Sequence, residues 1–128
     1  MKHHPGFLKM VEEARKHIRE ISIEDYLQMR EVGREHVLID VREDREWEAS
    51  HLPGALHIGK GVMERDIEGK VPDPQTLIVC YCGGGYRSAL VCESLQKMGY
   101  AHVLSLLGGF REWKEKELPL TRPHGNQT

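Results

Sequence analysis

The stretch TLIVCYCGGGYRSALVCESLQKM, residues 76–98, holds the clearest structural signal in this chain of 128 residues. Residues 76–81 form a short apolar run without polar alternation, which is typical of a buried strand. Three glycines follow Cys82, and apolar side chains then return at helical spacing from Arg87 to Met98. The stretch therefore predicts a strand, a tight glycine loop and a helix, with a cysteine where the loop begins.

The rest of the chain continues this alternation of short strands and helices. Residues 36–41, HVLIDV, and 102–106, HVLSL, predict two more buried strands. A brief apolar run also follows the turn at Pro53-Gly54. Short buried strands alternating with helices predict an α/β fold with a parallel sheet covered on both faces. Helices are expected at residues 7–20, after Ser22, at 60–68, and from Gly108-Gly109 through Trp113.

One rim of this sheet is the expected place for a binding site. In open parallel sheets, ligands bind beyond the carboxyl ends of the strands. Asp40 and Cys82 both stand at predicted carboxyl ends. We therefore expect these two residues to lie at the same rim of the sheet.

Composition and charge indicate an ordinary folded domain. Hydrophobic residues make up 39% of the chain and charged residues 30%, as in globular proteins. The net charge of −2 shows no basic excess, so no nucleic-acid partner is expected. No apolar run approaches the roughly 20 residues that span a bilayer, so no membrane segment is expected. The N-terminus lacks an apolar signal segment, and three cysteines without one predict free thiols in a cytoplasmic protein.

The glycine loop after Cys82 suits a negatively charged sulfur. A thiolate is the reactive form of cysteine, and the positive end of a helix dipole favours it. Consecutive glycines let the backbone turn tightly and direct several N–H groups at an anion. Arg87 adds a permanent charge and a fork of donors, while Ser88 can cap the helix or donate a hydrogen bond. The expected binding loop consists of Gly83, Gly84, Gly85, Tyr86, Arg87 and Ser88.

Four motifs in this order resemble the single-domain rhodaneses, a family of sulfurtransferases. They are LIDVREDREW at 38–47, HLPGALHI at 51–58, CGGGYRS at 82–88 and GGFREWKEKELPL at 108–120, and ISIEDY at 21–26 is also similar to that family. The resemblance implies a rhodanese-like fold with a central parallel sheet of about five short strands and helices on both faces. It implies a rhodanese domain at 20–120. The helical spacing before it predicts an N-terminal helical extension at 1–19, and the Pro, Gly, Asn and Gln residues after Thr121 predict a flexible tail at 121–128.

The resemblance also implies a covalent mechanism without a cofactor. Cys82 would attack the outer sulfur of a small anionic donor such as thiosulfate, release sulfite and become a persulfide. The outer sulfur would then pass to cyanide, a thiol or a protein acceptor in a ping-pong cycle. Arg87 and the loop amides would stabilise the persulfide charge. Asp40 and Arg42 match the family's DVR element, which implies support for the loop; the alternative is a surface ion pair.

The sequence leaves several alternatives open. Related cysteine phosphatases place the arginine six residues after the cysteine, whereas Arg87 follows Cys82 by five, which disfavours phosphatase or arsenate reductase chemistry. A module that binds partners without catalysis is another alternative. A protein persulfide donor or acceptor competes with thiosulfate, because the loop itself has few basic residues.

The remaining cysteines, the histidines and the N-terminal helix have simpler interpretations. Cys80 and Cys92 are expected in the core, although Cys80 could resolve an oxidised Cys82. The histidines form no spaced ligand set with the cysteines, so no metal is expected. The N-terminal helix either covers the sheet or contacts a partner, so the chain is expected to be a monomer or a homodimer.

Overall fold

The computed structural model describes residues 3–122. Its strands form one parallel sheet in the order β1-β5-β4-β2-β3, which confirms the expected α/β fold. The strands are β1 (Arg19–Ile21), β2 (Val37–Asp40), β3 (Leu56–His57), β4 (Ile78–Tyr81) and β5 (Val103–Leu106). The helices are α1 (Pro5–Arg15), α2 (Ile23–Glu31), α3 (Asp44–Ala49), α4 (Met63–Lys70), α5 (Tyr86–Lys97) and α6 (Gly109–Glu115), with a 3₁₀ turn η1 (Lys60–Val62) before α4.

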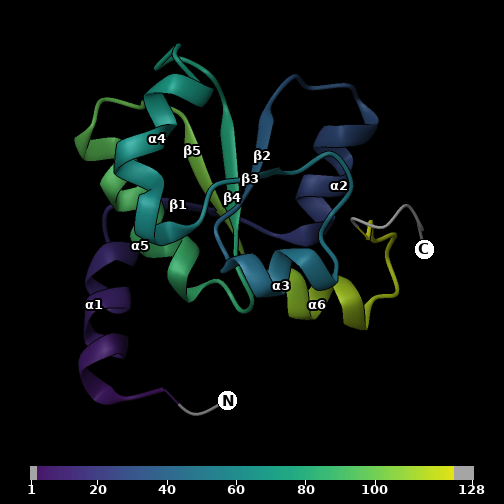
Figure 1. Cartoon of the computed structure of the whole chain (residues 1–128), viewed down its shortest axis with the longest axis horizontal. Coiled ribbons are helices and arrows are strands. Elements are labelled where there is room, and N and C mark those ends of the chain that lie inside the picture. Colours follow the sequence, from purple (N-terminus) through teal and green to yellow (C-terminus); the bar gives the residue numbers. More distant parts are fainter. Residues whose placement is uncertain (1–2, 123–128) are drawn as a thin grey trace.

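Different helices cover the two faces of the sheet (Figure 1). Side chains alternate along β4, as they do in any strand. Ile78 and Cys80 join the core that α4 and α5 close. Val79 and Tyr81 join the opposite core, which α2 and α6 close. The central strand is therefore buried on both faces, and its carboxyl end delivers Cys82 to the rim between the two layers.

The edge strand β1 departs from the sequence prediction. A helix was expected over residues 7–20, but α1 ends at Arg15 and residues 19–21 pair in parallel with β5. Ile18 packs into the core under α5, whereas Ile21 packs into the core on the other face. A helix would place residues three apart on one side, so only an extended chain can supply both cores. The helix of the expected 1–19 extension thus begins before residue 7 and ends at Arg15.

Helix α1 packs mainly against α5 rather than directly on the sheet (Figure 1). Val11 and Ala14 are its buried residues. The apolar face of this helix is thus covered within the chain. The oligomeric state stays a prediction.

The end of the described chain is held at Thr121. His51 and Thr121 exchange two backbone hydrogen bonds of 2.8 Å in an isolated antiparallel bridge. The flexible tail that was expected from residue 121 therefore cannot begin there, and residues 123–128 lie outside the described residues. None of the helices in residues 3–122 has the length and apolar character that crossing a bilayer requires.

A buried hydrogen-bond network joins the ends of β2 and β4. Asp40 lies opposite Tyr81 in the sheet register, and Cys82 follows directly, so the expected common rim is confirmed. The Tyr81 hydroxyl donates to Oδ2 of Asp40 at 2.6 Å and accepts from the N–H of Leu52 at 3.0 Å. Burial and then the Asp40 charge raise the pKa of Tyr81, which keeps this hydroxyl protonated.

Replacement of Tyr81 by Phe is expected to destabilise the fold by about 1–3 kcal/mol, because it leaves the buried N–H of Leu52 without its partner and removes one of the hydrogen bonds that Asp40 accepts. Urea unfolding of the variant measures this loss. Tyr86→Phe is the matched control, since the Tyr86 side chain is only half-buried. Equal unfolding midpoints for the two variants would show that the network contributes nothing to stability.

Candidate active site around Cys82

The sulfur of Cys82 lies in a cradle of hydrogen-bond donors. The backbone N–H groups of Gly85 and Ser88 donate to Sγ at 3.2 and 3.3 Å. The Ser88 hydroxyl lies 3.5 Å from the same atom. Cys82 itself is buried. Donors converge on the sulfur as they do in an anion nest, which is the arrangement expected from the glycine loop.

Helix α5 begins one residue after Gly85, which adopts a left-handed φ of +95° as the N-cap residue. The cap is therefore not Ser88, which lies in the first turn. Of the two roles expected for Ser88, donation of a hydrogen bond is met by its backbone N–H, whereas its hydroxyl accepts from the Cys82 thiol. Residues with φ in this range are usually glycine. This conformation explains why the third residue of the loop, Gly85, is a glycine.

Ser105 was not found by sequence reasoning. It is buried in β5, and its hydroxyl lies 2.7 Å from that of Ser88. The signal was a single hydroxyl within the apolar stretch HVLSL. Buried hydroxyls need a partner, and the register that pairs Ser105 with Cys80 brings this one behind the loop.

Helix α6 fixes the position of the loop from the other side. The N–H of Phe110 donates to the carbonyl of Cys82 at 2.8 Å, and that of Arg111 donates to Gly83 at 2.9 Å. Gly109 has a φ of +53°, and a Cβ at that position would collide with the carbonyl oxygen of Cys82. Close approach of the two backbones therefore requires glycine at residue 109.

The pair of Asp40 and Arg42 is not a surface ion pair, because their exposed fractions are only 0% and 3%. Nη2 of Arg42 donates to Oδ2 of Asp40 at 2.8 Å and to the carbonyl of Ser50 at 2.6 Å. The guanidinium also lies over the Phe110 ring, 4.0 Å from its centroid, within the range of a cation–π contact. The pair thus links β2, the end of α3 and the first turn of α6 beside the loop.

Arg87 forms an ion pair that the sequence did not reveal. Its Nη1 and Nη2 donate to the two carboxylate oxygens of Glu46 in α3, at 2.7 and 3.1 Å. The hydrogen bond from Arg87 lowers the pKa of Glu46, and the same bond raises the pKa of Arg87. The fork of donors expected to face an anion in the loop is therefore turned toward Glu46. The guanidinium remains close to the loop, because a Cβ on Gly83 would lie 3.1 Å from its Nη2.

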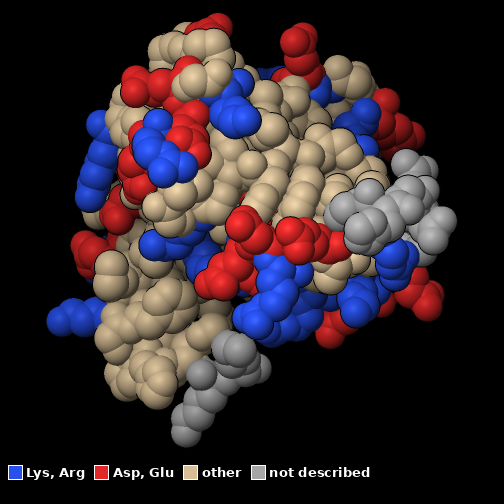
Figure 2. Space-filling model, viewed as in Figure 1, with Lys and Arg blue, Asp and Glu red and all other residues tan. Residues whose placement is uncertain are grey.

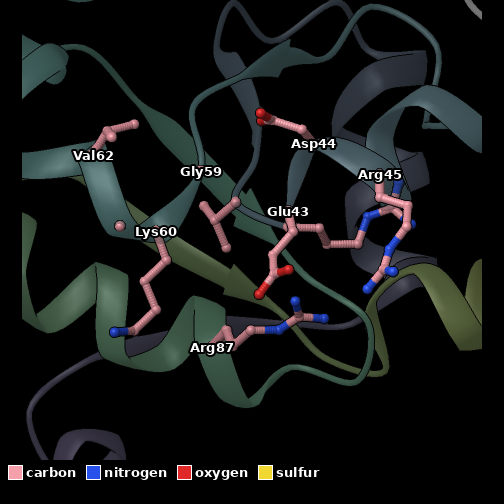
Figure 3. A pocket seen from close by; sticks show the side chains of 10 residues that line it. Glu43, Asp44, Arg45, Gly59, Lys60, Val62 and Arg87 are labelled. Carbon is pink, nitrogen blue, oxygen red and sulfur yellow. The ribbon is translucent and has the colours of Figure 1, made fainter.

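A hollow of about 640 Å³ lies between α3 and η1, next to the ion pair of Arg87 and Glu46. Figure 3 shows the Glu43 carboxylate directed toward Arg87, with Lys60 projecting from η1 on the other side. Two carboxylates, those of Glu46 and Glu43, thus face the Arg87 guanidinium. Since opposite charges nearby offset its field, other cations are needed to attract an anionic ligand.

Two further arginines line the pocket that contains Cys82, which Glu43 and Glu46 also line. This pocket has a volume of about 600 Å³, and both Arg45 of α3 and Arg111 of α6 line it. The Arg111 guanidinium reaches over Gly84, since a Cβ there would lie 3.8 Å from its Nη2. Figure 2 shows basic side chains over α3 and α6, with a band of acidic side chains next to them. Sequence reasoning missed both arginines, because only the tertiary fold brings these two helices to the loop.

The other two cysteines are buried and free. The hydrogen bond with Cys92 and then burial hold the pKa of the Cys80 thiol well above its ordinary range. Cys80 is therefore poorly suited to act as a thiolate, and both cysteines lie in the core, as expected. Among residues 3–122, no group of histidine, cysteine or acidic side chains could hold a metal ion.

Comparison with known proteins identifies the family. The family model described as the rhodanese-like domain matches residues 22–116. The chain belongs to the rhodanese-like domain family. The match leaves α1 outside this rhodanese-like domain and includes every strand except β1.

Relatives of this rhodanese-like chain carry names from sulfur chemistry. It is 31% identical over 99 residues to the putative sulfur carrier protein YrkF of Bacillus subtilis, covering 77% of this chain and 52% of the relative. The chain thus spans about half the length of that protein. It is 33% identical over 81 residues to the thiosulfate sulfurtransferase GlpE of Coxiella burnetii, covering 63% of this chain and 74% of the relative.

A solved structure extends the likeness beyond the rhodanese-like domain. A protein of unknown function from Rhodopseudomonas palustris, described as a possible tyrosine phosphatase, is 29% identical with a TM-score of 0.81. The comparison covers 94% of this chain and 98% of that protein. The overall architecture is therefore shared over almost the whole chain.

The contact between α6 and the loop generates a stability prediction. Gly109→Ala is expected to cost about 1–3 kcal/mol, as overpacked sites do, because a methyl group would push against the Cys82 carbonyl. Gly69→Ala in α4 is the matched control, since nothing lies within 4 Å of a Cβ there. That control is expected to stabilise by roughly 0.5–1 kcal/mol, as glycine replacement within a helix does. Urea unfolding compares the two, and equal effects would contradict the close approach.

Proposed function

We propose that this rhodanese-like domain is a sulfurtransferase in which Cys82 carries the transferred sulfur as a persulfide. The observation that carries the proposal is the position of its Sγ, which accepts hydrogen bonds from Gly85 and Ser88 and borders an open pocket. Such donors stabilise a thiolate before the reaction and a persulfide anion after it. The names of the relatives support sulfur transfer as the reaction class.

The proposed cycle has two steps. In the first, the Cys82 thiolate forms a bond to the outer sulfur of thiosulfate, the bond between the two thiosulfate sulfurs breaks, and sulfite leaves with that electron pair. In the second, an acceptor thiolate or cyanide attacks the outer sulfur of the persulfide, and the electron pair of the broken bond restores the Cys82 thiolate. The cycle therefore needs no cofactor or metal, and it is a covalent, ping-pong mechanism.

In this mechanism, the surrounding residues have separate tasks. The amides of the loop stabilise charge on sulfur, and the buried pair of Asp40 and Arg42 supports the loop through Ser50 and Phe110. Arg87 links the loop to α3 through Glu46. A reducing compartment such as the cytoplasm would keep Cys82 in the thiol form between turnovers.

The basic mouth of the pocket favours a small anionic donor over a protein persulfide. The glycine loop offers no free cation of its own, but Arg45 and Arg111 supply two from neighbouring helices. Positive side chains at a pocket mouth raise the local concentration of an anion such as thiosulfate. A protein persulfide is the alternative donor. The name of the relative YrkF, a putative sulfur carrier protein, supports this alternative.

Phosphatase chemistry has less support, although one structurally similar protein is described as a possible tyrosine phosphatase. A phosphoryl group needs several donors for its oxygens, whereas both terminal Arg87 nitrogens bind Glu46. The loop amides that contact Sγ are those of Gly85 and Ser88. Two backbone donors around one sulfur suit a single added sulfur atom better than a phosphoryl group with three oxygens.

The persulfide is tested by the intact mass of the reduced protein after brief exposure to thiosulfate. The parent chain is expected to gain one sulfur atom, and Cys82→Ser is expected to gain none, because the nucleophile is lost. Cys80→Ala is the control and should gain sulfur like the parent. Sulfur on the Cys82→Ser variant would place the carrier elsewhere. An unloaded parent that a cysteine desulfurase does load would favour the protein donor.

The role of the pocket mouth is tested by Arg111→Gln. The variant is expected to raise the KM for thiosulfate about two- to fivefold at low salt, the range for one exposed charge. Added salt should reduce the difference, since it screens exposed charges. Lys114→Gln, which removes a charge from the same helix away from the pocket lining, is the control. An equal effect of the two substitutions would leave no specific role for Arg111.

A further inference from the structure

Part of the wall of the Cys82 pocket comes from outside the rhodanese-like domain. His3 and Phe7 line the pocket together with Cys82 and the first two glycines of the loop. Both residues precede the segment matched by the family model, which begins at residue 22. Figure 1 shows α1 standing beside the amino-terminal end of α5, where the loop ends. Part of the pocket lining therefore comes from a segment that the family model does not match.

Three aromatic rings form this wall, those of His3, Phe7 and Tyr86. The His3 and Tyr86 rings meet edge to face with their centroids 4.6 Å apart, and the Phe7 and Tyr86 centroids are 6.2 Å apart. The His3 and Phe7 rings are 5.2 Å apart. All three side chains are half-buried, so each keeps part of its surface open. A ring cluster of this kind offers an apolar surface to a ligand.

The aromatic wall is fixed to the fold by the other end of α1. Val11 and Ala14 are fully buried against the body of the protein. The Arg15 guanidinium lies over the Tyr86 ring at 5.1 Å from its centroid, and Arg15 Nε is 3.2 Å from Oε2 of Glu20. The Tyr86 ring thus contacts the Arg15 cation as well as the rings of His3 and Phe7. Because these side chains are already held in place, binding a ligand against them costs little additional conformational entropy.

The pocket is larger than an inorganic sulfur donor requires. Its volume of about 600 Å³ falls within the range of roughly 300–1,000 Å³ that is typical of sites for organic ligands. The charged lining of the same pocket is positive by one, because it consists of three arginines and two carboxylates, those of Arg45, Arg87, Arg111, Glu43 and Glu46. The surface of α1 that faces the viewer in Figure 2 is largely uncharged, whereas basic side chains and a band of acidic ones lie beside each other over α3 and α6. One side of the pocket therefore suits an apolar group and the other an anion.

We infer that this pocket binds an organic thiol with a flat aromatic body and an acidic group, and that Phe7 determines this preference. The inference rests on the proposed function and specifies its acceptor. The aromatic body would lie against His3, Phe7 and Tyr86, and the acidic group would face Arg45 and Arg111. The acceptor thiolate bonds to the outer sulfur of the Cys82 persulfide, and the electron pair of the cleaved sulfur–sulfur bond returns to Sγ. The product is the persulfide of the aromatic thiol, and no separate oxidant is consumed.

Binding without reaction is the first test, because it does not depend on sulfur transfer. Isothermal titration of the reduced parent chain compares benzenesulfonate with methanesulfonate, which carries the same charge without the ring. Benzenesulfonate is expected to bind at least about tenfold more tightly, as stacking of one ring allows. Equal affinities for the two anions would overturn the inference, even if the protein transfers sulfur.

Substitutions in α1 test whether the Phe7 ring causes the preference for benzenesulfonate. Phe7→Ala is expected to remove most of the preference for benzenesulfonate, and Phe7→Leu, which keeps apolar volume without a ring, should also reduce it. Met10→Ala is the control, because Met10 lies on the same helix with 61% of its surface exposed. Thermal unfolding of each variant confirms that α1 stays in place. An unchanged preference in both Phe7 variants would overturn the assignment of Phe7.

Sulfur transfer from the loaded enzyme provides the second test. The acceptors are cyanide, 3-mercaptopropionate and 4-mercaptobenzoate, of which the last two share a carboxylate and only the last has a ring. Phe7→Ala should lower kcat/KM for 4-mercaptobenzoate about tenfold, the loss of one ring contact, and leave cyanide within about twofold. An equal loss for all three acceptors would show a general defect and overturn the inference. If the parent forms no persulfide, the proposed function fails, while the titration still decides whether the aromatic wall binds its ligand.

Discussion

The hydrogen bonds from α6 to the carbonyls of Cys82 and Gly83 orient the loop on which the site depends. A loop of glycines has little conformational preference of its own, so its shape must be imposed from outside. In a planar trans peptide, the C=O and the following N–H point in opposite directions. Fixing these two carbonyls on α6 therefore turns the N–H groups of Gly83 and Gly84 to the opposite side of the loop. The close approach that this requires explains the glycine at residue 109.

Separate parts of the chain supply the donors around the Cys82 sulfur and the lining of its pocket. The loop and the first turn of α5 provide the donors around Sγ of Cys82. The pocket around them is completed by α3, α6 and α1, which are distant from one another in the sequence. Arg87 illustrates the separation, because its position in the loop motif suggests an anion ligand, yet both of its terminal nitrogens bind Glu46. The ion pair of Arg87 and Glu46 joins α5 to α3, so Arg87 contributes to the shape of the site.

Local sequence patterns predicted the main strands, the helices and the cysteine loop, because each depends on neighbouring residues. The alternation of short apolar runs with helical periodicity was enough for the parallel sheet. β1 was missed because three residues carry too little periodicity, and only the placement of Ile18 and Ile21 in different cores reveals it. Arg45, Arg111 and Ser105 were missed for another reason. Their relation to Cys82 exists only after α3, α6 and β5 have packed around the loop.

The hydroxyl groups of Ser88 and Ser105 can change the direction of their hydrogen bonds when the charge on the Cys82 sulfur changes. The two oxygens are 2.7 Å apart, and either hydroxyl can donate to the other. Hydroxyl protons rotate to suit their surroundings. When the sulfur is negative, the Ser88 proton can turn toward it while Ser105 donates to Ser88; when the sulfur is a neutral thiol, both directions can reverse. The interior of the domain can thus adjust its polarity by rotating two O–H bonds, while every heavy atom keeps its place.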